Sequence, residues 1–144
     1  MSDIISPYLW AIFVAWLVAH GIKSVLNFSQ ARGRGVIRQL FISGGMPSSH
    51  AATTVAVWTV VLIKDGPQSG LFGLATLVAM IVCYDAIKVR RSVGEQGIAI
   101  IELIEATKSK VKLPRAARGH TPVELVVGAL LGVLIGLVVY LATT

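Results

Sequence analysis

Charged residues are scarce in this sequence. They make up 14% of its 144 residues, whereas 55% of the residues are hydrophobic and the mean hydropathy is +0.77. A soluble domain usually carries about 25% charged residues and cannot bury so large an apolar fraction inside itself. The composition therefore excludes an ordinary soluble domain and predicts a membrane-embedded protein. The length corresponds to a single domain, residues 1–144.

Cysteine is almost absent as well. Cys83 is the only one and lies within an apolar run, so the sequence excludes a disulfide framework. Basic residues are missing from the N-terminus, where Ser2 and Asp3 precede the first apolar stretch. A secretory signal peptide would carry a basic segment and a small-residue cleavage site there. We therefore expect the first apolar stretch to be a retained helix.

Four apolar stretches are present, and each approaches the ~20 residues that cross ~30 Å of hydrocarbon as a helix. They run from Pro7 to Leu26, Pro47 to Ile63, Gly70 to Ile87 and Pro122 to Leu141. The second is the shortest, so we expect it to be buried among the others or to begin below the headgroups. The predicted fold is all-α, a polytopic membrane bundle of about four transmembrane helices.

The basic residues are confined to two connections between these stretches. Of the 13 Lys and Arg residues, 12 fall within residues 23–38 and 88–118, and only Lys64 lies elsewhere. Cytoplasmic loops are enriched in Lys and Arg. We therefore expect both connections in the cytoplasm and both termini outside, in the plasma (inner) membrane of a prokaryote. The net charge of +6 then indicates contact with the membrane surface rather than with nucleic acid.

The second connection contains an amphipathic pattern over residues 94–108. Isoleucines and glutamates recur at helical spacing on opposite faces: Ile98, Ile101 and Ile104 against Glu95, Glu102 and Glu105. This pattern predicts a cytoplasmic amphipathic helix that lies on the membrane or packs on a partner.

Two stretches carry small residues four positions apart, which let helix backbones approach closely in lipid. They are Ala11, Ala15 and Ala19 in the first stretch and Gly128, Gly132 and Gly136 in the fourth. Such seams pack helices either within one protomer or between protomers, and the sequence does not decide between them. The sequence therefore leaves open whether the protein forms a homo-oligomer.

Two predicted helix starts carry a histidine. GGMPSSH precedes the second stretch and GHTPVE precedes the fourth, so that His50 and His120 lie near helix N-termini, each with a proline expected in the first turn. Helix N-termini present unpaired N–H groups and a positive dipole end, which together attract phosphate. By the topology above, both starts face the cytoplasm.

Other polar residues reach the same membrane face. Lys23 ends the first stretch, and Asp85, Arg90 and Arg91 follow the third. Two histidines, an acid and several cations suit phosphoryl transfer: one imidazole attacks phosphorus, the cations neutralise the phosphoryl oxygens, and a second imidazole protonates the leaving group.

The two histidine motifs resemble those of a known superfamily. Pro47-Ser48-Ser49-His50 matches three of the four positions of its Pro-Ser-Gly-His motif, and His120 is followed four residues later by the acid Glu124. With Lys23 as the first-motif lysine, the chain resembles the type 2 phosphatidic acid phosphatase superfamily. It is most similar to the short divergent branch related to acid phosphatases and vanadium-dependent haloperoxidases.

The resemblance implies a role for each matching residue. His120 would be the nucleophile that forms a phosphohistidine, Glu124 would orient it, and His50 would be the general acid. Phosphate would be held by five residues, with Asp85 in support: Lys23, Ser48, Ser49, Arg90 and Arg91. The resemblance implies no metal and no cofactor. The substrate would be a lipid phosphate or diphosphate at the cytoplasmic leaflet.

Alternatives remain at several of these positions. Thr121 and Glu124 have the spacing of a capping box, and Ser48 and Ser49 are also typical N-caps. Ser49 replaces the family's glycine, and the Arg-Pro of the first motif is absent. These departures favour a second interpretation, a non-catalytic membrane protein that binds lipid phosphates or assists transport. A structural or assembly protein built on the glycine seam is a third.

Overall fold

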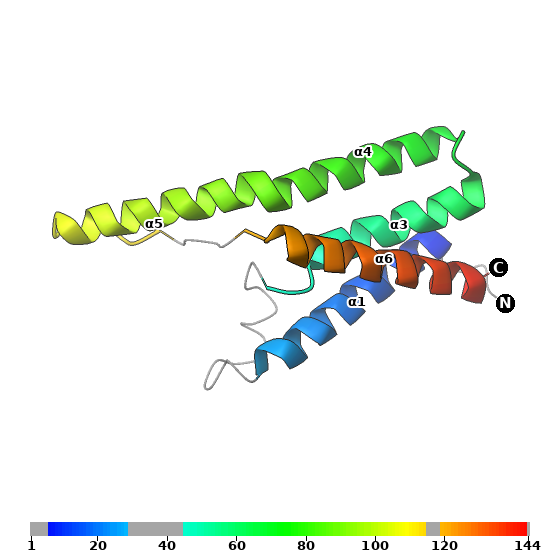
Figure 1. Ribbon diagram of the computed structural model, residues 1–144, viewed down its shortest axis with the longest axis horizontal. Helices are drawn as coiled ribbons and strands as arrows, with labels where there is room; N and C mark the ends of the chain where they lie inside the picture. The colour runs from blue at the N-terminus through cyan, green and yellow to red at the C-terminus, as the bar shows by residue number, and fades with distance from the viewer. Residues whose placement is uncertain (1–5, 29–44, 115–118, 144) are drawn as a thin grey trace.

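The structure is a computed structural model that describes residues 6–28, 45–114 and 119–143. These residues form α1 (Pro7–Phe28), α3 (Ser49–Asp65), α4 (Gly70–Tyr84), the π-helical segment η1 (Asp85–Val89), α5 (Arg90–Ala106) and α6 (Pro122–Thr143) (Figure 1). The described part of the chain contains helices and no strand, which confirms the all-α prediction.

The central helix is α3. It packs against α1, α4 and α6, and α1 also contacts α6. Successive long helices alternate in direction, so the start of α1 and the end of α6 lie together at one end (Figure 1). The starts of α3 and α6 lie at the opposite end, which we call the histidine end because His50 and His120 are there. Which end faces the cytoplasm stays a prediction.

Three helices are long and apolar enough to cross a membrane. They are Pro7–Leu26, the continuous helix Gly70–Ala106 and Pro122–Thr143. With 17 residues, α3 extends only about 25 Å, so the expected count of four spans is not confirmed. As expected for the shortest stretch, α3 is buried among the others, and Ala51, Ala52 and Val60 on it are fully inaccessible.

The predicted amphipathic helix is not a separate element. Residues 70–106 form one unbroken helix, in which η1 joins α4 to α5 and α5 extends beyond the other helices (Figure 1). A π-helical segment inserts a wider turn without ending the helix, and residues 84–93 contain no proline or glycine that would stop it. On the isoleucine face of α5, Ile98 is 45% exposed, and Ile101 and Ile104 are partly buried.

The glycine seam of α6 packs against α3 within the protomer. A Cβ at Gly128 would lie 2.5 Å from the carbonyl oxygen of Ser48, and one at Gly132 would lie 2.5 Å from that of Ala52. Real Cβ atoms do not approach so closely, so the glycines let the two backbones touch. The alanines of α1 also face inward, since Ala15 is fully buried in the core with Ala56 of α3. These contacts hold the start of α3 against the first turns of α6.

Candidate functional site

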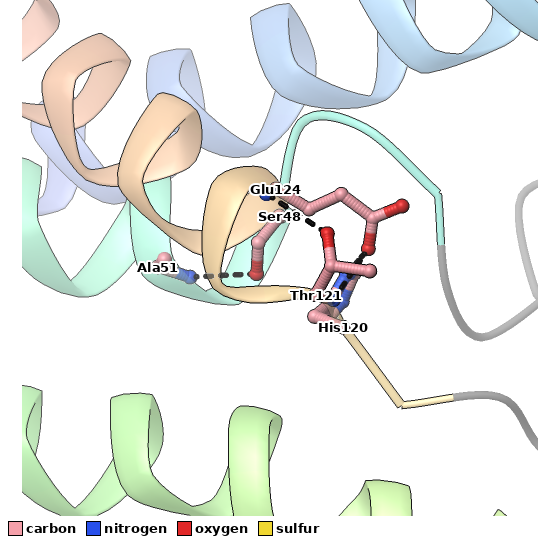
Figure 2. Close-up of polar contacts among 5 residues, drawn as sticks. All are labelled: Ser48, Ala51, His120, Thr121 and Glu124. Carbon is pink, nitrogen blue, oxygen red and sulfur yellow. Dashed lines mark hydrogen bonds and ion pairs between the residues drawn. The ribbon is translucent and has the colours of Figure 1, made fainter.

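His120 and Glu124 begin α6 as a linked pair. The carboxylate oxygen Oε2 of Glu124 lies 3.3 Å from Nδ1 of His120 and accepts a 2.9 Å hydrogen bond from the backbone N–H of Thr121. In return the Glu124 N–H donates to Oγ1 of Thr121 over 3.3 Å (Figure 2). The capping box is therefore present. The same oxygen contacts the imidazole, so one carboxylate makes both the capping contact and the contact with His120.

The tautomer of His120 follows from this contact. A carboxylate can only accept hydrogen bonds, so Nδ1 carries the proton and Nε2 keeps its lone pair. Burial holds the pKa of His120 below its usual value, and the positive charges of Lys23 and Arg90 lower this pKa further, against the opposing effect of the Glu124 hydrogen bond. At neutral pH the imidazole is therefore neutral, the form that a nucleophile requires.

The segment before α6 is fixed against the long helix. The backbone N–H of His120 donates to the carbonyl of Ala86 over 3.1 Å. A Cβ at Gly119 would lie 2.5 Å from the backbone nitrogen of Arg91, so only glycine allows this approach. His120 is 4% exposed as a result. Neither Gly119 nor Ala86 was among the predicted site residues; the glycine immediately before His120 was the available signal.

Ser48 ties the start of α3 to the start of α6. Its backbone N–H donates to the carbonyl of Glu124 over 3.1 Å, and its hydroxyl accepts from the N–H of Ala51 over 3.4 Å (Figure 2). Ser48 is thus the N-cap, as the capping interpretation predicted. Its backbone is extended, which leaves Pro47 before the cap rather than in the first turn, where we expected it. The side chains of Ser48 and Ser49 are buried, so phosphate binding by their hydroxyls stays a prediction.

His50 lies in the first turn of α3 and is exposed. Arg90, Lys23 and the imidazole of His120 interact electrostatically with its side chain. Since such interactions fall off with distance and with solvent screening, these groups share one region at the histidine end. The backbone N–H groups of Ser49 and His50 also belong to this first turn, where an α-helix supplies no intrahelical acceptor.

Lys23 enters the same region from α1. Its side chain is 7% exposed, and it interacts electrostatically with Glu124, His120 and His50. A cation buried beside an acid and two imidazoles is unusual for a simple membrane-surface anchor, because surface anchors extend toward water.

The two arginines behave differently. Arg90 pairs with Asp85 at 2.6 Å, with both side chains about 40% exposed (41% and 38%), and its charge acts on both histidines. Arg91 pairs with Glu95 at 3.1 Å on the exposed surface of α5. Arg91 and His120 both line a cavity of about 240 Å³. Arg90 is thus the arginine that interacts with both imidazoles, and Asp85 is its partner.

Among the described residues, no three His, Cys, Asp or Glu side chains converge in a way that could hold a metal ion. The cations Arg32, Arg34, Arg38, Arg115 and Arg118 lie outside the described residues.

Comparisons with known proteins identify the family. Residues 5–135 match the model of a family described as the divergent PAP2 family. The chain is 37% identical over 111 residues to the "Uncharacterized membrane protein YuiD" of Bacillus subtilis (strain 168), an alignment covering 67% of this chain and 70% of that protein. No solved structure matches. The family match covers most of the chain and includes both histidine motifs, as the sequence resemblance predicted: this membrane protein belongs to the divergent PAP2 family.

Proposed function

We propose that this protein is a membrane lipid-phosphate phosphatase that works through a phosphohistidine. The observation that carries the proposal is the buried His120, held by Glu124 in the nucleophilic tautomer. Electrostatic interactions of His120 with Lys23, Arg90 and His50 support the proposal, because phosphoryl transfer needs cations and a second imidazole near the nucleophile. Membership of a PAP2-related family supports the same chemistry.

In the first step, Nε2 of His120 attacks the phosphorus of a phosphomonoester or diphosphate headgroup. The bond between phosphorus and the leaving oxygen breaks, and protonated His50 gives its proton to that oxygen. Glu124 stabilises the positive charge that develops on the imidazole, and Lys23 and Arg90 offset the charge on the phosphoryl oxygens. The product is a phosphohistidine at His120 and the released alcohol or lipid monophosphate.

In the second step, a water molecule attacks the phosphohistidine. His50, now neutral, takes a proton from that water, and the bond between phosphorus and Nε2 breaks. Inorganic phosphate leaves, and both imidazoles return to their initial forms. The cycle therefore needs no metal and no redox cofactor. Phosphatidic acid, phosphatidylglycerophosphate and polyprenyl diphosphates are the candidate substrates, presented at the cytoplasmic leaflet if the Lys and Arg distribution sets the orientation.

A phosphate-release assay tests the proposal. Purified protein in lipid vesicles would be given each candidate substrate, with vanadate as an inhibitor that resembles phosphate. We expect wild-type protein to release phosphate from at least one substrate and vanadate to block it. His120→Ala should release none, and full activity in this variant would remove the mechanism.

A second candidate is a non-catalytic lipid-phosphate binder. It is favoured by the capping box, which explains Glu124 without catalysis. Binding of lipid phosphate or vanadate, without turnover of any substrate in the panel, would support it. The assembly interpretation loses its motivation, because the glycine seam is occupied by α3 of the same chain.

A further inference from the structure

An apolar groove lies along α3 between α1 and α4. Its volume is about 460 Å³, within the range of roughly 300–1,000 Å³ that is typical of small-molecule sites. Thr54, Val57 and Val61 of α3 form its floor, with Ile12 of α1 and Val78 of α4 among its walls. None of the functional residues discussed above lines it.

The groove continues the face of α3 that carries His50. Residues 50, 54, 57 and 61 are separated by four, three and four positions, the spacing that aligns side chains on one side of a helix. The wall formed by α1 also leads toward His50. Tyr8 and Ile12 line the groove. His20 lies about two turns further along α1 and interacts electrostatically with His50. The groove and the histidine end are therefore adjacent.

The lining presents hydrocarbon to the groove. The hydroxyls of Thr53 and Thr54 each donate a 2.8 Å hydrogen bond to a backbone carbonyl of their own helix, Ser49 and His50 respectively. Their polar atoms are thus satisfied within α3. At the far end, the hydroxyl of Tyr8 donates to Asp65 over 2.6 Å. Among the described residues that line the groove, Tyr8 is therefore the one whose polar group is bonded outside its own helix, and His50 lies one helical turn beyond the lining at the other end.

The length of the groove matches one leaflet. Its floor spans Thr53 to Val61, which is about 12 Å at 1.5 Å per residue. One half of a hydrocarbon core of ~30 Å is about 15 Å. A hydrocarbon chain that begins at a headgroup beside His50 would run along this floor within a single leaflet.

We propose that the groove binds one hydrocarbon chain of the lipid phosphate whose headgroup occupies the histidine end. The proposal rests on the function proposed above for the headgroup. A chain moving from bilayer to groove gains little hydrophobic free energy, because lipid is as apolar as the groove. What the groove supplies is position: it fixes the lipid so that its phosphate stays at His50 and His120.

Photo-crosslinking tests the groove without requiring turnover. A phosphatidic acid with a diazirine midway along one acyl chain would be mixed into vesicles containing the protein or His120→Ala, irradiated, and the labelled peptides mapped. We expect labels to concentrate on residues 53–61 and 71–78 in both proteins. A phosphatidylcholine with the same chain should label these segments about tenfold less, because its headgroup has no partner at the histidine end.

Two matched variants test whether the hydrocarbon chain lies in the groove. Val78→Trp fills the groove, whereas Leu77→Trp puts the same tryptophan at a neighbouring exposed position of α4 that does not line the groove. Val78→Trp should reduce labelling of residues 53–61 by about tenfold, because added bulk in an occupied space is not accommodated. Leu77→Trp should leave labelling unchanged.

The outcomes separate the two proposals. Even labelling over all exposed apolar surfaces, or equal labelling by phosphatidylcholine, overturns the groove whether or not phosphate is released. Concentrated labelling that Val78→Trp removes supports the groove, even if no lipid phosphate is hydrolysed. In that last case only the phosphatase function would fail.

Discussion

The starts of α3 and α6 are similar in sequence and different in environment. Each has a capping hydroxyl residue next to its histidine motif, at Ser48 and Thr121. However, His120 precedes its helix, is 4% exposed and contacts Glu124, whereas His50 lies inside the first turn and is exposed. Under the proposed function this difference matches the two roles: the buried imidazole beside Glu124 suits the nucleophile, and the exposed one suits proton exchange with substrate and water.

Among variants that compare the two helix starts, removal of the His50 imidazole should have the largest effect. His50→Ala should lower the rate of phosphate release by about 10²–10⁴-fold, the usual contribution of a general acid. The loss should be smaller with an aryl phosphate, whose leaving group needs less protonation. Steady-state assays on a lipid phosphate and an aryl phosphate measure both values. Equal losses on the two substrates would contradict the assignment of His50 as the acid.

Glu124→Gln should alter the pH profile. Glutamine still accepts a hydrogen bond from Thr121, so the cap is kept, but the negative charge that raises the pKa of His120 is lost. That pKa therefore falls further. The rate rises as His120 loses its proton, so the acidic limb of the profile should move to lower pH, and the maximal rate should fall by about tenfold or more. An unchanged acidic limb would argue against His120 as the titrating group.

Thr121→Ala is the matched control for that variant. It removes the hydroxyl that caps Glu124 but leaves the contact between Glu124 and His120. Loss of an N-cap typically costs ~1 kcal/mol of stability, and the pH profile should stay in place. Thermal unfolding in detergent and the pH profile of phosphate release measure the two effects.

Gly128→Ala should separate the two helix starts. The new Cβ would meet the carbonyl of Ser48 at 2.5 Å, so α6 must move away from α3, at a cost of ~1–3 kcal/mol. Gly73→Ala in α4 is the control, because a Cβ there meets nothing within 4 Å, and it should stabilise its helix by ~0.5–1 kcal/mol. Equal melting temperatures for the two variants would contradict the seam.

The smallest effect is expected at the salt bridge. Asp85→Asn breaks the pair with Arg90, but exposed pairs contribute only ~0.2–1 kcal/mol. Unfolding should therefore change little. The released Arg90 should lower KM for a lipid phosphate by a few-fold with kcat unchanged. A large loss of kcat would show that Asp85 acts in the chemistry itself.

Much of the molecule could be predicted from local patterns. The predicted ends of the first and fourth stretches lie within two residues of the ends of α1 and α6. They could be predicted because a proline at the start and an unbroken apolar run are local signals. The family resemblance was confirmed for the same reason. The capping alternatives for Ser48 and Thr121 were also realised.

Other features depend on contacts that no local pattern encodes. The junction of α4 with α5 was missed because a π-helical segment leaves no Gly, Pro or cap in the sequence. The seam of α6 could be recognised, but whether it packs within or between chains depended on where α3 lies. Likewise, Arg90 and Arg91 are adjacent in sequence, and only the geometry distinguishes the one that acts on both histidines.

Trapping of the phosphoryl group is the most direct test of the central claim. Protein mixed with radiolabelled lipid phosphate would be quenched rapidly in alkali, which preserves phosphohistidine, and the labelled peptide identified. We predict label on His120 alone and none in His120→Ala. Phosphate release at the wild-type rate with no label on His120, or with label on another residue, would contradict the account.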